Sequence, residues 1–208
     1  MKPTAVTFYG GVNERGGNKI LLEDGDARIF LDFGTSFADE SRYFCSYLAP
    51  RGVNGAGDYL EFGLLPKLSG IYAREMIENT DIKYEPPSIS AVIVSHPHID
   101  HVGYFPFIDE NVPVYLGECT KTIIDAMQES SRIDLGQHKF RTFRTGKKFS
   151  VDSLEIEPVH VDHSIPGAYG FIIHTSEGTI VYSGDFRLHG PMSQMTKEFS
   201  ERAAESDP

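Results

Sequence analysis

Residues 95–103 read SHPHIDHVG, and they hold three of the eight histidines in this 208-residue chain. A proline follows His96 and favours an extended backbone there. In an extended segment, side chains two positions apart point the same way, so His96 and His98 can bind one ion. If the chain turns into a helix after residue 99, Asp100 and His101 point toward a second position. The stretch therefore predicts two adjacent half-sites for metal ions.

Four apolar strands predicted from the sequence each lead into a histidine or an aspartate. Asp32 follows RIFL, His96 follows AVIVS, His163 follows PVHVD and Asp185 follows TIVYSG. In layered α/β folds, sites gather beyond the ends of strands, where loops converge. His160 lies within the strand that ends at His163, so we favour His163 as the ligand. We expect the four strand-end residues to lie close together.

The candidate ligands are imidazole nitrogens and carboxylate oxygens. These atoms suit zinc, at distances of about 2.0–2.2 Å. Manganese and iron accept the same ligands, so the residue types alone leave the metal open. A single histidine is more often structural, but here three occur together, with further candidates at strand ends. We therefore favour a metal site and assign structural roles to His138, His174 and His189.

The composition favours one globular, cytoplasmic domain. Hydrophobic residues make up 40% of the chain and aromatic residues 12%, enough for a core. No apolar run is long enough to span a bilayer, and the N-terminus lacks the features of a signal peptide. Cys45 and Cys119 are far apart, which argues against a disulfide framework. Because the formal net charge is −11, a nucleic acid would have to be held locally, by metal or by a basic patch.

The pattern of apolar residues predicts an α/β chain with three parts. A meander of strands occupies residues 5–34, a long excursion with short helices covers 36–87, and strands alternate with helices over 88–208. The last part includes a helix at 119–132, a hairpin at 168–186 and a polar helix at 193–208. Aromatic residues of the excursion are expected to pack on the core, with a wall of a substrate cleft as the alternative; they are Tyr43, Phe44, Tyr47, Tyr59, Phe62 and Tyr72.

Several motifs resemble a known family. HPHIDH at 96–101 resembles the H-x-H-x-D-H signature of the metallo-β-lactamase fold. GGVNERGGNKILLE at 10–23, HSIPGAYGF at 163–171 and YSGDFRLHG at 182–190 look like the β-CASP nucleases, particularly the ribonuclease J type. Thioester and lactone hydrolases of this fold tend to have a GHTPG-like third motif instead. The resemblance implies an α/β fold, the αββα sandwich, with its first half, the hairpin carrying the fourth motif and an incomplete second half.

The resemblance also implies site roles. Two divalent ions are expected, with zinc favoured and manganese the alternative. His96, His98 and His163 would hold the first ion, Asp100 and His101 the second, and Asp185 both. Asp32 would brace the signature loop by hydrogen bonds. Asp100, His163 and Asp185 are the expected catalytic residues. Ser164 would contact the substrate phosphate, with a turn residue before Pro166 as the equally weighted alternative.

The resemblance further bears on domain organisation. The family carries one more histidine ligand, and a β-CASP domain inserted after the fourth motif, which here lies at Asp185. We therefore expect residues 1–208 to be the N-terminal portion of the metallo-β-lactamase domain, with the β-CASP insertion and the C-terminal remainder absent. This portion alone is expected to be a weak or inactive enzyme.

The function implied by the resemblance is metal-dependent hydrolysis of phosphodiester bonds in RNA. The alternatives are a small-molecule hydrolase of the same fold, acting on a thioester, lactone or phosphodiester, and a non-catalytic metal-binding module.

One basic cluster could bind the backbone of a nucleic acid, although we favour a plain half-buried strand. The cluster comprises Lys139, Arg141, Arg144, Lys147 and Lys148 around Phe140 and Phe143. The sequence does not distinguish RNA from DNA as the substrate, exonuclease from endonuclease cleavage, or a homo-oligomer from a monomer.

Overall fold

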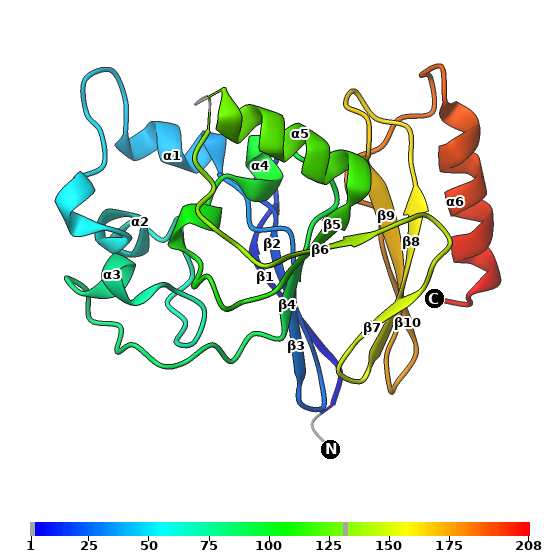
Figure 1. Cartoon of the computed structure of the whole chain (residues 1–208), viewed down its shortest axis with the longest axis horizontal. Coiled ribbons are helices and arrows are strands. Elements are labelled where there is room, and N and C mark those ends of the chain that lie inside the picture. Colours follow the sequence, from blue (N-terminus) through cyan, green and yellow to red (C-terminus); the bar gives the residue numbers. More distant parts are fainter. Residues whose placement is uncertain (1–2, 131–132) are drawn as a thin grey trace.

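Two β-sheets face each other at the centre of the molecule, and helices cover their outer faces (Figure 1). This computed structural model describes residues 3–130 and 133–208. The first sheet has the order β1-β2-β3-β4-β5-β6 and the second has the order β10-β9-β8-β7. The last two residues of the expected helix 119–132 lie outside the described residues.

The first sheet begins as the meander predicted from the sequence. Strands β1 (Ala5–Gly10), β2 (Lys19–Asp24) and β3 (Ala27–Leu31) pair antiparallel. Strands β4 (Ala91–Ile93), β5 (Val114–Gly117) and β6 (Phe140–Phe143) then add in parallel. Because parallel strands share their direction, the ends of β3 and β4 open onto the same edge of the sheet.

Alternation along the strands creates the layers. Leu21 and Phe30 face the outer core beneath the helices, whereas their neighbours Leu22 and Ile29 face the core between the sheets. Phe171 of the second sheet belongs to the same inter-sheet core. Both faces of the first sheet are therefore buried, which explains the near-continuous apolar runs of β3 and β4.

The second sheet is antiparallel. It contains β7 (Phe149–Val151), β8 (Leu154–His160), β9 (Tyr169–His174) and β10 (Thr179–Tyr182). The polar helix predicted at the C-terminus is α6 (Ser193–Glu205), and it covers the outer face of this sheet. Its Phe199 lies so close to Gly170 that an added Cβ would come within 2.5 Å of the ring. The fourth layer is thus present, and the predicted αββα arrangement is confirmed.

The excursion contains short helices, as predicted: α1 (Phe37–Tyr43), the 3-10 turn η1 (Gly52–Asn54), α2 (Gly57–Glu61) and α3 (Arg74–Ile77). Tyr72 is fully buried, and Tyr43 stacks on Phe62 with ring centroids 4.3 Å apart. Tyr47 is 93% exposed, so the prediction that it packs on the core is wrong. It lies beyond α1 in a loop whose backbone bonds are local, and nothing covers it among the described residues.

Three further short elements complete the layer over the first sheet: α4 (Ile99–Val102), the 3-10 turn η2 (Phe105–Phe107) and α5 (Glu118–Glu129). Helix α4 begins directly after His98, where the sequence predicted a turn into a helix. Within residues 3–130 and 133–208, no helix has the length and apolar character needed to cross a membrane.

A buried carboxylate joins the two sheets at the end opposite the strand-end histidines. Asp24 accepts hydrogen bonds from Thr4 Oγ1 at 2.8 Å, Ser176 Oγ at 2.5 Å and Ser176 N at 3.1 Å. Hydrogen bonding, first from Ser176, holds the pKa of Asp24 below its usual value of 3.8. Asp24 therefore stabilises the fold above pH 3.8, and this contribution disappears as the pH falls through the lower pKa of the folded state.

We expect Asp24→Ala to lower the free energy of unfolding by about 2 kcal/mol at pH 7, because a charged acceptor is lost. Urea unfolding at pH 7 and at a strongly acidic pH measures the effect, which should shrink in acid. Asp26→Ala, in the adjacent exposed turn, is the matched control and should change the free energy by less than about 0.5 kcal/mol. Equal effects of the two substitutions would contradict this assignment.

Candidate metal centre

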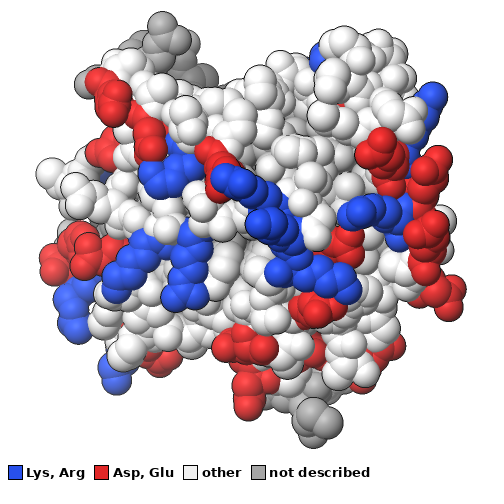
Figure 2. Space-filling view, turned by 45° about the vertical axis from the view of Figure 1, so that its right-hand side comes forward, with Lys and Arg blue, Asp and Glu red and all other residues white. Residues whose placement is uncertain are grey.

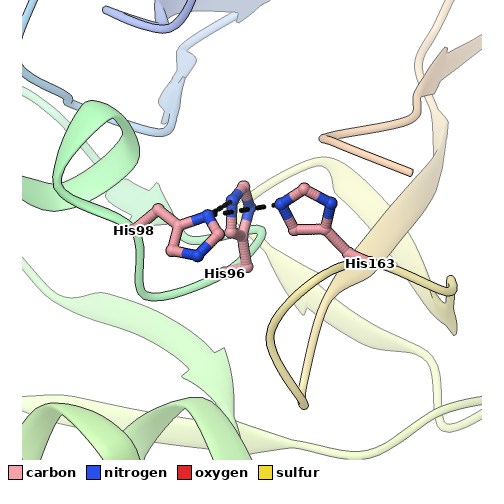
Figure 3. Close-up of side chains that lie close together, drawn as sticks. All are labelled: His96, His98 and His163. Atoms are coloured by element: carbon pink, nitrogen blue, oxygen red, sulfur yellow. Dashed lines mark hydrogen bonds between the residues drawn. The ribbon is translucent and has the colours of Figure 1, made fainter. Parts of the chain in front are cut away.

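The histidines predicted at strand ends meet at one edge of the sandwich. His96 and His98 lie on the loop between β4 and α4, and His163 lies just beyond β8. Figure 3 shows the three rings pointing toward one another from these separate segments. Ligand atoms of the three residues all lie within 4.8 Å of one another.

The contacts among these rings suit a shared cation. Nδ1 of His98 is 3.0 Å from Nε2 of His96 and 3.2 Å from Nε2 of His163. One ring nitrogen has a single lone pair or a single proton, so Nδ1 of His98 cannot form a good hydrogen bond with both partners. Two nitrogen ligands on a tetrahedral zinc ion lie about 3.3 Å apart, close to the observed spacing.

A second group adjoins the first and contains His96, His101 and Asp185. Oδ1 of Asp185 is 3.6 Å from Nε2 of His101, and its other oxygen is 3.8 Å from Nε2 of His163. Oδ2 of Asp100 is 3.8 Å from the same His101 atom. Nε2 of His101 is buried and has no hydrogen-bond partner among the described residues. An unpartnered buried nitrogen facing two carboxylates is what a cation site requires.

Asp32 organises the signature loop from beneath. Its two oxygens accept hydrogen bonds from Ser95 N, Ser95 Oγ and His101 Nδ1, each at 2.7 Å. Its φ of 58° lies in the left-handed region, which aspartate tolerates better than most residues. The carboxylate is completely buried, so these donors replace the water it has lost. Asp32 therefore links the end of β3 to two residues of the signature loop.

These bonds set the proton positions on two of the histidines. Asp32 only accepts, so His101 donates from Nδ1, and its Nε2 faces Asp100 and Asp185. The single hydroxyl proton of Ser95 also goes to Asp32, so Nδ1 of His96, at 3.0 Å, must donate to Ser95 Oγ. That leaves Nε2 of His96 without a proton, in the neutral form that binds metal. A cation bound at His101 would take the place of its Nε2 proton.

The electrostatics of the site agree with this arrangement. Burial lowers the pKa of His96 to about 2, so its ring is neutral. Burial alone would also lower the pKa of His101, but Asp32 and Asp185 outweigh it and raise the pKa to about 10. The neighbouring His101 imidazole in turn lowers the pKa of Asp185 to about 2. The carboxylates thus create a negative potential that favours positive charge at this position.

Two residues that support Asp32 were not identified from the sequence. The Tyr182 hydroxyl donates to Oδ2 of Asp32 at 2.5 Å, and Asn18 Nδ2 donates to that hydroxyl at 3.0 Å. Tyr182 ends β10, three residues before Asp185, so one hairpin carries both a candidate ligand and a brace. A tyrosine in an apolar strand resembles any core residue, and its hydroxyl partner lies 150 residues away. Only the position of Asn18 beside two glycines hinted at a special role.

The other predicted positions are distributed as follows. Ser164 is exposed and lines the same cavity as His163. His160 stacks on Tyr169, with centroids 4.2 Å apart, and joins neither ligand group. His138 contacts the Phe105 carbonyl, His174 contacts Thr179, and His189 is exposed. None of these three belongs to a group of candidate ligands within the described ranges.

The basic cluster around β6 is engaged in local contacts. Arg144 pairs with Glu118 at 2.7 Å and Lys148 with Glu155 at 2.7 Å. Lys139 donates to Asn111, and Arg141 donates to the Tyr115 hydroxyl. Figure 2 shows a band of Lys and Arg side chains that lies among acidic ones on one face of the molecule. These pairings favour the plain-strand interpretation over a nucleic-acid track.

Comparisons with known proteins agree with the fold and the motifs. The family model described as "Beta-lactamase superfamily domain" matches residues 70–204. A ribonuclease J of Mycoplasma genitalium is 28% identical over 189 residues, which cover 90% of this chain and 28% of that protein. The chain spans about a quarter of the length of the curated relatives it matches.

Solved structures give the same result. A crystal structure titled as a protein of unknown function from Enterococcus faecalis has a TM-score of 0.78 and 29% identity, covering 96% of this chain and 47% of that one. A metallo-beta-lactamase fold protein from Bacillus subtilis shares the fold, with a TM-score of 0.51 and 19% identity over 88% of this chain and 63% of that one. The chain therefore belongs to the beta-lactamase superfamily, as a ribonuclease J-like protein of the metallo-beta-lactamase fold.

Proposed function

We propose that this chain carries the metal-binding half of a hydrolase that cleaves phosphodiester bonds in RNA. The observation that carries the proposal is the convergence of three histidines and Asp185 from loops that follow β4, β8 and β10. The relatives named ribonuclease J support RNA as the substrate class. Residues 1–208 are then the N-terminal portion of the metallo-beta-lactamase domain of a β-CASP enzyme.

The distances support a division of the ligands. His96, His98 and His163 would hold a first divalent ion, and His101 with Asp100 would hold a second. One oxygen of Asp185 lies toward His101 and the other toward His163, and in this proposal Asp185 would serve both sites. Nitrogen and carboxylate ligands favour zinc, and manganese is the alternative.

The residues of the chain prepare this chemistry in defined ways. When bound, two such ions make a water molecule more acidic and neutralise charge on a phosphate. Asp32 and Ser95 accept hydrogen bonds from Nδ1 of His101 and of His96, which directs both Nε2 atoms toward the candidate ligand groups. Ser164 lines the same cavity, and in this proposal its hydroxyl would donate to a phosphate oxygen of the substrate. Asp100, Asp185 and His163 are the proposed catalytic residues.

Removal of metal tests the proposal. We expect the intact parent protein, of which residues 1–208 are the proposed N-terminal portion, to cleave RNA with added zinc or manganese and to lose this activity in excess chelator. Gel analysis of a labelled single-stranded RNA, before and after chelation and with metal restored, measures it. Efficient hydrolysis of thioesters or lactones with RNA left intact would favour the small-molecule alternative. Tight metal binding with no hydrolysis of either would favour a non-catalytic module.

Metal content of residues 1–208 tests the division into two ion sites. The first site has three imidazoles and Asp185, whereas the second has only His101, Asp100 and the shared Asp185. We therefore expect one ion per chain to survive gentle dialysis and the second to be lost. Elemental analysis gives the ratio directly. Two equally retained ions per chain would contradict the unequal sites.

A further inference from the structure

A cavity of about 670 Å³ opens beside the candidate metal centre, and two of its walls have no role in that centre. His98, Asp100, His163 and Asp185 form the side that belongs to the ligand groups. On the other side stand Arg15, from the loop between β1 and β2, with Phe37 and Ala38 from the start of α1. These two walls bring a cation and an aromatic ring to the cavity beside the candidate metal centre.

Among the described residues of the cavity wall, Arg15 is the one lysine or arginine. The chain has a formal net charge of −11, and Arg15 forms no ion pair with a carboxylate of the described ranges. An uncompensated guanidinium facing a metal centre suits a phosphate oxygen, which it can grip through two N–H groups.

The loop that carries Arg15 is held firmly against the signature loop. The backbone N–H groups of Gly17 and Asn18 both donate to the carbonyl of Asp100, at 3.1 and 3.2 Å. Gly16 has a φ of 73°, and an added Cβ would lie 2.3 Å from the Asp100 side chain. Only glycine permits this approach, so Arg15 is kept next to a residue of the metal centre.

Two further contacts tie the loop to α1. Glu14 accepts hydrogen bonds from Gly11 N and from the hydroxyl of Ser36, the residue that caps α1. Lys19 is fully buried, and its ammonium donates to the carbonyls of Gly17 at 2.8 Å and Gly34 at 3.0 Å. The positions of the Arg15 loop and of the start of α1 are therefore fixed relative to each other.

Phe37, the first residue of α1, is 51% exposed although it is large and apolar. Proteins that bind single-stranded nucleic acids combine an exposed aromatic ring with a nearby cation. A base stacks on the ring, and the cation contacts the phosphate backbone. A base in a duplex is already stacked on both faces and cannot reach such a ring.

We infer that Arg15 and Phe37 form a nucleotide subsite, in which Arg15 binds the phosphate next to the scissile one and Phe37 stacks on an unpaired base. The inference rests on the proposed function and narrows it to single-stranded polynucleotide. The 2′-hydroxyl plays no part in these two contacts, so RNA and DNA strands of one sequence share them.

Binding of a labelled oligonucleotide tests the subsite without relying on catalysis. The probe is a cleavage-resistant 2′-O-methyl decauridylate, with the same-length oligothymidylate and a blunt duplex as further arms, measured by fluorescence anisotropy with and without added zinc. Arg15→Gln is expected to weaken single-strand binding about tenfold and to reduce the slope of log affinity against log salt by about 0.7, one phosphate contact. Phe37→Leu should weaken it by about five- to a hundredfold, and Phe37→Tyr should restore it.

Matched controls come from the same region. Arg42, on α1, is exposed and pairs with Asp39 at 2.8 Å, and Tyr47 is exposed beyond that helix. Arg42→Gln and Tyr47→Leu remove the same charge and a comparable ring away from the cavity, so binding should stay within about twofold. The duplex should bind weakly and be insensitive to Phe37→Leu.

The outcomes separate this inference from the proposed function. If the wild-type protein cleaves RNA but Arg15→Gln and Phe37→Leu bind the single strand like the wild type, the subsite is wrong and the function stands. If only the two control variants weaken binding, the nucleic acid follows another surface and the subsite is again wrong. If the wild-type protein neither cleaves RNA nor binds any strand, both the proposed function and the subsite are wrong.

Discussion

His98→Ala is expected to reduce RNA cleavage by about a thousandfold, equivalent to about 4 kcal/mol of transition-state stabilisation. Nδ1 of His98 is the atom that lies within 3.2 Å of both His96 and His163, so its loss leaves two ligands where three converged. The ring is partly exposed, and the fold should survive its removal. Initial rates with saturating metal, together with metal content per chain, measure the effect.

The control for this substitution is His174→Ala. His174 is a partly buried histidine on β9 whose side chain contacts Thr179 and which stands outside both ligand groups. The His174→Ala variant should cleave RNA at a rate within about threefold of the wild type. Similar losses in the two variants would show that the fold, and not a metal site, explains the effect. Full activity of His98→Ala would remove this residue from the ligand set.

Asp32→Asn is expected to weaken metal binding by about 10–100-fold, because Asp32 orients the His101 imidazole. The amide brings an NH₂ group to a position where Ser95, His101 and Tyr182 all donate hydrogen bonds. At least one buried donor then loses its partner, which should lower the free energy of unfolding by about 1–3 kcal/mol. Metal titration monitored by calorimetry and urea unfolding measure the two effects.

A second aspartate with a left-handed backbone provides the control. Asp152 has a φ of 50° in the exposed turn between β7 and β8 and makes no contact with the metal centre. Asp152→Asn preserves the same backbone preference, so it should leave both metal affinity and stability nearly unchanged. If Asp32→Asn behaved like Asp152→Asn, the bracing role of Asp32 would be wrong.

The sequence predicted the parts of the fold that depend on local pattern. Apolar runs such as AVIVS locate β4, and alternation separates the two faces of β2. The candidate ligands could be proposed because histidine and aspartate are rare directly after apolar strands, and because parallel strands end at one edge. His163 was preferred over His160 by this reasoning alone, and the structure directs His163 and not His160 toward His98.

The contacts that hold the site in place could not be predicted in this way. The hydroxyl of Tyr182 bonds a residue 150 positions away, the amide of Asn18 bonds one 164 positions away, and the buried Lys19 donates to two carbonyls. Sequence pattern records which face of a strand a residue occupies, but it does not record which loop packs there. The place of Arg15 beside Asp100 depends on the tight packing of Gly16, which only coordinates reveal.

The most direct test of the metal centre is an anomalous difference map, recorded at the zinc absorption edge from crystals grown with zinc. The arrangement described here predicts a strong peak about 2.0–2.2 Å from Nε2 of His96, Nδ1 of His98 and Nε2 of His163. A weaker peak is expected between His101, Asp100 and Asp185. A map with zinc bound elsewhere, and with no density among the three histidine nitrogens, would contradict the assignment.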